Sequence, residues 1–197
     1  MIELDPQGMT RDEIYKVLTG AVAPRPIAWI TTRSRRNVVN AAPFSAYTLV
    51  SQDPPLVLFQ ADAALREKDT IVNIRNTGEF VVNVATMRLL DAMHQCSAPL
   101  PPDVSETEAF GIELADSKVV AVPRVAASPV AFECRLYRMF DVGNEPHTIV
   151  IGEVVCFQID ESVFADGKID HRKLDPVSRI GGPYYARMGE FIYKPVR

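Results

Sequence analysis

A group of charged and polar side chains surrounds the start of a predicted short helix at 70–76: Arg66, Lys68, Asp69, Thr70 and Asn73. The N-terminus of a helix presents unpaired N–H groups and a partial positive charge, so it favours an anion such as a phosphate group. Lys68 and Arg66 would add positive charge there, and the hydroxyl of Thr70 would add a donor. Asp69 supports a different interpretation, because an Asp that caps the helix would take the same N–H groups. From spacing alone, an anion site and an ordinary capped helix with a basic flank both remain open.

A second group is the run of small and polar residues at 40–45, with the sequence Asn-Ala-Ala-Pro-Phe-Ser. Ala41 and Ala42 carry so little side chain that a flat molecule could approach the backbone, while Asn40 and Ser45 offer hydrogen bonds. Ligand pockets are typically built in this way, with a few polar groups on a wall that leaves room for the ligand. A bulge or a crossover between two strands is the alternative interpretation of the same residues.

The sequence carries no pattern for metal or nucleophilic chemistry. Cys96, Cys134 and Cys156 are widely spaced and form no CxxC pair, which argues against a zinc site and against a disulfide framework. No convincing nucleophile–base pair stands out, and no GxGxxG motif follows a predicted strand. We therefore expect no metal ligands and no Rossmann-type dinucleotide site.

The segments that must position the two polar groups are mainly strands. Strands are predicted at 26–32, 38–41, 56–60, 79–85, 130–140 and 148–159, where apolar residues dominate or alternate. Short helices are predicted at 11–18, 70–76 and 89–95; the first begins with the capping box Thr10–Glu13, and Gly78 ends the second. A turn is predicted at 33–37, with Asn37 at positive φ, and a loop at 98–102.

These elements predict a mostly β fold, namely an antiparallel barrel with short peripheral helices, because the strands do not alternate with long helices. No linker or repeat divides the 197 residues, so one domain is expected over 1–197. A net charge of −4 argues against nucleic acid as a partner. No apolar run reaches the roughly 18 residues of a membrane helix, and no signal-peptide pattern is visible, so a cytoplasmic protein is expected.

Taken in order, several short motifs resemble the flavin reductase-like, FMN-binding split-barrel family. They are PRPIAWITT at 24–32, NAAPFS at 40–45, DPPL at 53–56, KDT at 68–70 with Asn73, GEFVVN at 78–83, His147 with IGEV at 151–154, and RIGGPYY at 179–185. The resemblance spans roughly residues 10 to 195, and the ordered set is specific although each motif alone is weak. The family often has a glycine in the turn before the Asn, whereas this chain has RSRRN at 33–37.

The resemblance implies a split β-barrel that forms a homodimer and holds FMN in a groove near the subunit interface. It also implies three groups of cofactor-binding residues. The flavin would lie against Asn40, Ala41, Ala42 and Ser45, with Thr31 and Thr32 near the ring or the ribityl chain, and the phosphate would face Lys68, Asp69, Thr70 and Asn73.

Three more residues are candidates for the same site. His147 precedes a predicted strand; it could titrate near neutrality and touch the nicotinamide or the flavin, and a structural histidine is the alternative. His147 is the single candidate for a catalytic residue. Tyr184 and Tyr185 follow a Gly-Gly-Pro bend and could flank the flavin, with core or interface packing as the alternative.

An NAD(P)H-dependent flavin reductase that transfers hydride to FMN is the main functional interpretation of the sequence. The alternatives are a reductase component that serves a partner monooxygenase, an FMN-binding protein without appreciable turnover, and a structural barrel with no cofactor. The sequence does not distinguish NADH from NADPH as the reductant.

Overall fold

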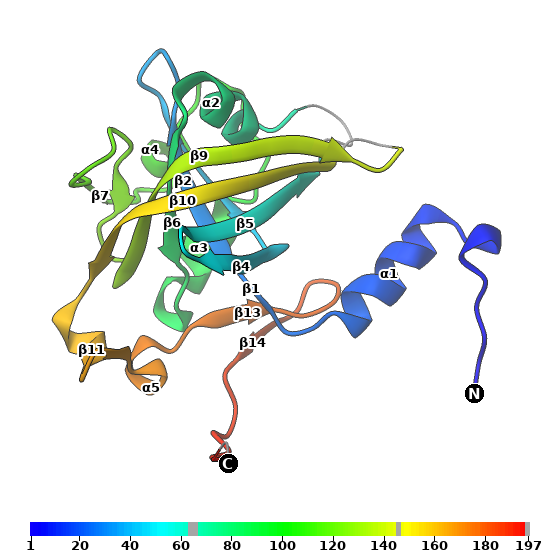
Figure 1. Ribbon diagram of the computed structural model, residues 1–197. Coiled ribbons are helices and arrows are strands. Elements are labelled where there is room, and N and C mark those ends of the chain that lie inside the picture. Colours follow the sequence, from blue (N-terminus) through cyan, green and yellow to red (C-terminus); the bar gives the residue numbers. More distant parts are fainter. Residues whose placement is uncertain (63–66, 145–146, 196–197) are drawn as a thin grey trace.

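The computed structural model describes residues 1–62, 67–144 and 147–195. Its largest element is a seven-stranded antiparallel sheet with the strand order β3-β2-β6-β9-β10-β5-β4 (Figure 1). The strands are β2 (Ala28–Arg33), β3 (Val39–Phe44), β4 (Tyr47–Gln52), β5 (Pro55–Asp62), β6 (Glu79–Val84), β9 (Val130–Val142) and β10 (His147–Ile159). The sequence predicts all of these strands except β4.

The two edge strands of this sheet are consecutive in the chain. β3 and β4 stand at opposite ends of the strand order, yet only Ser45 and Ala46 separate them. The sheet must therefore curl until its edges approach each other. At this corner the N–H of Gln60 on β5 donates to the carbonyl of Ala46 (2.8 Å). The result is an open-sided antiparallel barrel, as the sequence predicts.

Aromatic side chains fill the interior of the barrel. The ring centroids of Phe44 and Phe59 are 4.9 Å apart, and those of Phe59 and Phe80 are 5.7 Å apart. Gly152 on β10 faces Phe80 so closely that an added Cβ would lie 2.2 Å from the ring. Any side chain at this position would displace the core, which explains why this strand contains a glycine.

Three short helices contact β3: α2 (Asp69–Thr77), α3 (Leu90–Gln95) and α4 (Glu106–Ala109). Ile71 and Ile74 fix α2 because both are buried in the barrel core. Gly78 ends this helix at φ +73°, as predicted. The helices at 70–76 and 89–95 are thus confirmed within a few residues, whereas α4 lies in a segment for which the sequence predicts no element.

The first helix, α1 (Arg11–Ala21), stands out from the barrel (Figure 1). Its predicted capping box at Thr10 is present. None of its residues is buried, and three large apolar side chains are exposed: Tyr15, Val17 and Leu18. Arg25 holds the end of the helix, because Nη1 donates to the carbonyl of Thr19 (2.8 Å) and Nη2 donates to that of Ile180 (3.1 Å). At the other end, Arg11 Nη2 lies 3.9 Å from Asp62 Oδ1 on β5, so the helix is held at both ends and still carries an uncovered apolar surface.

The remaining elements are short. A second sheet has the order β1-β13-β14, with β1 (Arg25–Pro26), β13 (Val177–Arg179) and β14 (Tyr185–Arg187). The others are η1 (Pro6–Gly8), η2 (Met87–Leu89), β7 (Leu114–Ala115), β8 (Arg124–Val125), η3 (Glu161–Val163), β11 (Phe164–Ala165), β12 (Lys168–Ile169) and α5 (His171–Leu174). Asn37 has φ +64°, as predicted for its turn. Among the described residues, no helix has the length and apolar character needed to span a membrane.

Candidate functional site

A cavity of about 210 Å³ lies between β3, the start of α2 and the segments that follow α3. Its lining residues are Asn40, Ala42, Pro43, Phe44, Lys68, Asp69, Thr70, Cys96, Ser97, Ala98, Pro99, Leu100 and Glu106. The two polar groups that the sequence singles out therefore meet at one place, although about 25 residues separate them in the chain. Five of the predicted cofactor-binding residues line this cavity: Asn40, Ala42, Lys68, Asp69 and Thr70.

The N-terminus of α2 reaches the cavity without a side-chain cap. Lys68 occupies the N-cap position, and no side-chain capping hydrogen bond is found there among the described residues. The expectation that Asp69 caps the helix is therefore wrong, because the helix begins one residue earlier than predicted and Asp69 is its first residue. Arg66, the other basic residue of this group, lies outside the described residues. With Lys68 exposed at the N-cap, this end of the helix can receive an anion.

Hydrogen bonds between side chains tie α2 to the neighbouring strands. Asn40 Nδ2 on β3 donates to Thr70 Oγ1 (3.4 Å), and Asn73 Nδ2 donates to Thr32 Oγ1 on β2 (3.1 Å). All four side chains are buried. Asn40 and Thr70 face the cavity, whereas Thr32 and Asn73 are not among its lining residues. Of these four predicted cofactor-binding residues, Asn40 and Thr70 can contact a ligand, whereas Thr32 and Asn73 connect α2 to β2.

Thr31 and Ala41 also lie behind the cavity wall. The hydroxyl of Thr31 donates to the carbonyl of Pro123 (2.7 Å) and accepts from Asn83 Nδ2 (3.2 Å). The methyl group of Ala41 is fully buried in a cluster that contains Trp29. The side chains at 31 and 41 therefore stabilise the two strands, and at 41 only the backbone can approach a ligand.

Besides Thr31, Thr32, Ala41 and Asn73, four further predicted site residues do not line the cavity: Ser45, His147, Tyr184 and Tyr185. His147 is the first residue of β10, and its Nδ1 lies 2.8 Å from Gln60 Nε2. Tyr184 is 69% exposed on the bend after β13. Tyr185 is partly buried, and its hydroxyl lies 2.9 Å from His94 Nδ1. The proposed contacts of these four residues with the flavin or the nicotinamide therefore stay predictions.

Two parts of the cavity wall were not predicted from the sequence as ligand-binding: residues 96–100 and the single residue Glu106. Cys96 is buried, and burial raises the pKa of its thiol to about 12, so the thiol presents a neutral group to the cavity. Glu106 is 7% exposed, and its Oε2 accepts the N–H of Ala41 (3.1 Å). A sequence signal was present, since Ser105-Glu-Thr-Glu108 has the pattern of a capping box. Ser105 does cap α4, by accepting the N–H of Glu108.

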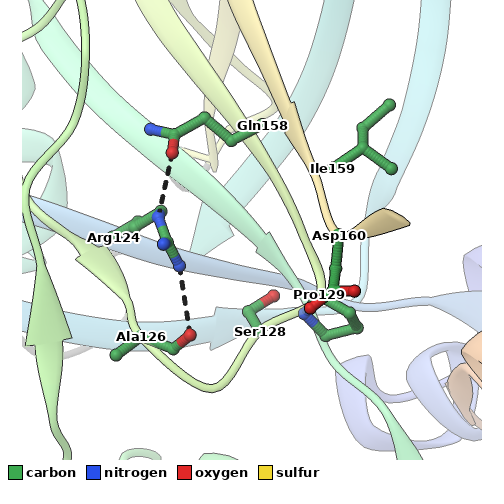
Figure 2. A pocket seen from close by; sticks show the side chains of 7 residues that line it. All are labelled: Arg124, Ala126, Ser128, Pro129, Gln158, Ile159 and Asp160. Carbon is green, nitrogen blue, oxygen red and sulfur yellow. Dashed lines mark hydrogen bonds between the residues drawn. The ribbon is translucent and has the colours of Figure 1, made fainter. Parts of the chain in front are cut away.

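A separate cleft lies at the C-terminal end of β10, around Arg124 (Figure 2). Arg124 Nε donates to Gln158 Oε1 (3.1 Å), and Nη1 donates to the carbonyl of Ala126 (3.1 Å). Figure 2 shows the guanidinium between these two partners. Its hydrogen bonds join the segment after β8 to β10, so Arg124 has a structural role there. None of the predicted site residues lines this cleft.

The described residues contain no group of three or more His, Cys, Asp or Glu side chains that could hold a metal ion. What the cavity offers is an uncapped helix end with a lysine, a wall of small residues, and buried amide and hydroxyl groups. This combination suits the binding of a flat molecule that carries an anionic group.

Comparison with known proteins gives consistent matches. The sequence pattern of the flavin reductase like domain matches residues 20–175. An uncharacterized protein of Halalkalibacterium halodurans is 40% identical over 195 residues, which cover 96% of this chain and 93% of that protein. Among solved structures, nitrilotriacetate monooxygenase component B from Bacillus cereus has 34% identity and a TM-score of 0.95, with 98% of each chain covered. The 2-nitrobenzoate 2-nitroreductase of Pseudomonas fluorescens has 33% identity and a TM-score of 0.91, with 100% of this chain and 96% of that chain covered.

Proposed function

Because this chain belongs to the flavin reductase-like family, we propose that it is an FMN-binding oxidoreductase in which NADH or NADPH reduces FMN. The observation that carries the proposal is the cavity in which the uncapped start of α2 meets the wall of small residues on β3. Of the predicted cofactor-binding residues, those on the cavity wall come from both segments.

The residues present fit the two ends of FMN. The ribityl phosphate would lie at the N-terminus of α2, where Lys68 supplies a positive charge and Thr70 a hydroxyl. The isoalloxazine ring would lie along β3, where Ala42 leaves room and the Asn40 amide can hydrogen-bond. The buried Asn73–Thr32 pair would keep the helix end at a fixed distance from this strand.

FMN, when bound, supplies the hydride-accepting chemistry, and the protein supplies binding, orientation and electrostatics. The N-cap of α2 holds the anionic end, and the backbone of β3 defines the plane of the wall. Segment 96–100 forms a further part of the cavity wall, in addition to β3 and the start of α2. His147 would be an aid to the reaction, not an essential acid, because it does not line the cavity and already contacts Gln60.

A role as the reductase component of a two-component system is the second candidate. It is supported by the likeness to nitrilotriacetate monooxygenase component B over nearly the whole chain. In that case reduced FMN would leave the cavity and serve a partner monooxygenase. The likeness to a 2-nitrobenzoate 2-nitroreductase favours instead a bound flavin that reduces an organic acceptor. An FMN-binding protein without appreciable turnover remains the third candidate.

We propose in addition that the chain forms a homodimer. The uncovered apolar surface of α1 supports this, and so does an apolar cleft of about 710 Å³ between β4, β5, β9 and β10. Two side chains beside this cleft are largely exposed, Leu49 at 73% and Phe157 at 53%. A second copy would remove these surfaces from water, which is favourable in proportion to the apolar area buried.

Anaerobic stopped-flow spectroscopy tests the proposed reaction. Protein loaded with FMN is mixed with NADH and, separately, with NADPH, and the oxidised-flavin absorbance is followed. We expect one or both reductants to bleach the bound flavin faster than they bleach free FMN. Bound FMN that neither reductant bleaches faster than free FMN would contradict the reductase function and favour the binding protein.

A further inference from the structure

The outer edge of β3 is covered by side chains and not by another strand. β3 is an edge strand, so the carbonyl of Val39 and the N–H of Ala41 face away from β2. Ser105 Oγ donates to the Val39 carbonyl (2.6 Å), and Glu106 Oε2 accepts the Ala41 N–H (3.1 Å). Consecutive side chains thus take the hydrogen bonds that a neighbouring strand would otherwise make.

Glu106 makes this contact inside the candidate flavin site. Its side chain is buried and lines the cavity together with Asn40 and Lys68. The hydrogen-bonded N–H belongs to Ala41, the residue between Asn40 and Ala42 on the cavity wall. The position of the wall therefore depends on a carboxylate that is 65 residues distant in the chain.

We propose that Glu106 is a positioning residue for the flavin, an inference that rests on the proposed FMN-binding function. Its carboxylate acts in two ways. The hydrogen bond to Ala41 fixes the part of β3 against which the ring lies, and the carboxylate places a buried negative charge beside that wall. Charged groups near a flavin tune its electronics. A negative charge beside the ring disfavours additional electrons on it, so it lowers the reduction potential of the bound flavin.

Three variants separate the hydrogen bond from the charge. Glu106→Gln keeps an oxygen that can accept the Ala41 N–H but removes the charge. Glu106→Ala removes both. Glu108→Gln is the matched control, because it makes the same change of charge on the same short helix at an exposed side chain. Fluorescence titration gives the FMN affinity, visible circular dichroism reports the orientation of the bound flavin, and a spectroelectrochemical titration gives its midpoint potential.

For Glu106→Ala we expect FMN affinity to fall by up to about 10- to 100-fold, the full worth of a hydrogen bond to a charged group, because the wall on β3 loses its support. The visible circular dichroism of the flavin should change as well. For Glu106→Gln we expect an affinity within about threefold of the parent chain and a more positive midpoint potential. Glu108→Gln should match the parent chain in all three measurements.

Two results would overturn the inference while leaving the proposed function intact. One is a folded Glu106→Ala protein with the FMN affinity and flavin circular dichroism of the parent chain. The other, which decides the matter if Glu106→Ala does not fold, is a Glu106→Gln protein whose midpoint potential equals that of Glu108→Gln. A parent chain that binds no FMN is a different result, since it would overturn the proposed function itself.

Discussion

At the scale of single residues, Lys68 offers a direct test of the phosphate site. It is exposed at the N-cap of α2, so its removal should leave the fold intact. A charge-assisted hydrogen bond is worth about 1.5–3 kcal/mol, so Lys68→Ala should weaken FMN binding about 10- to 100-fold. Riboflavin, which lacks the phosphate, should bind both proteins equally. Isothermal titration calorimetry with FMN and with riboflavin measures the two affinities, and Lys118→Ala is the control for the loss of an exposed lysine. An equal loss of affinity for FMN and riboflavin in Lys68→Ala would contradict the phosphate assignment.

Ala42 tests the wall of small residues. Ala42 lines the cavity and also packs against the barrel core, so the larger side chain of Ala42→Leu should push a bound ring away from β3. A misplacement of even about 1 Å can cost about 10²-fold in rate, and we expect flavin reduction to slow by about that factor. Ala46→Leu, at an exposed corner of the same chain segment, is the control and should be neutral. Stopped-flow reduction by NAD(P)H gives the rate of flavin reduction in both variants. An unchanged rate in Ala42→Leu would contradict the placement of the ring against β3.

His147 contacts Gln60 and does not line the cavity. His147→Ala should therefore lower turnover by less than the roughly 10²–10⁴-fold that follows the loss of a general acid or base. Steady-state NAD(P)H oxidation measures the effect, with the exposed His171→Ala as the control. If turnover falls by more than 10²-fold while FMN remains bound, His147 takes part in the chemistry.

At the scale of elements, one buried carboxylate holds a loop to the sheet. Glu133 on β9 is fully buried and accepts the N–H groups of Lys118, Val119 and Val120, together with an amide hydrogen from Gln158. Burial alone would raise the pKa of Glu133, but the three backbone donors and the amide outweigh it and hold the pKa below its ordinary value. The charged form thus fastens the segment after β7.

This pKa shift predicts how stability depends on pH. Because the pKa of Glu133 is lower in the folded than in the unfolded chain, its contribution is complete above the unfolded pKa and is lost as the pH falls through the folded value. Urea unfolding should therefore give a lower midpoint for Glu133→Gln than for the parent chain at pH 7. The two midpoints should converge as the medium becomes more acidic, and a constant difference down to pH 3 would contradict the assignment.

Elements whose signals are local could be predicted from the sequence, and elements held by distant contacts could not. The capping box at Thr10, the glycine at 78 and the positive φ of Asn37 all depend on neighbouring residues, and the structure confirms each. β4 was not predicted, because its exposed edge position leaves no alternation of buried and exposed residues.

The same distinction holds within the candidate site. The residue types at 40–45 and 68–70 indicated a ligand, and the fold brings both segments to one cavity. Glu106 was not found, because its significance depends on a hydrogen bond to Ala41 that no local pattern encodes. Asp69 was misassigned because a shift of one residue in the helix start moves it from the cap into the first turn.

At the scale of the whole molecule, α1 leads to a prediction about assembly. A helix of 11 residues is marginal in water without tertiary packing, and α1 has no buried residue of its own. In the proposed homodimer the second copy would supply this packing. Leu18→Asp should then shift the dimer toward monomer, and Lys16→Asp, an exposed change on the same helix, should do so less. Light scattering over a range of concentrations measures the equilibrium; a parent chain that remains monomeric with full FMN occupancy would contradict the proposal.

The covered edge of β3 has a further consequence for how the protein behaves in a crowded solution. An edge strand with unpaired N–H and C=O groups is a template on which another chain can add a strand, and this is a common route to aggregation. Ser105 and Glu106 occupy the outward-facing groups at 39 and 41, so an incoming strand would first have to displace both side chains and bury a carboxylate. The strand that faces the cavity can therefore be rich in small residues without pairing with the strands of other molecules. Loss of α4 should make the protein aggregate under conditions in which it is still folded.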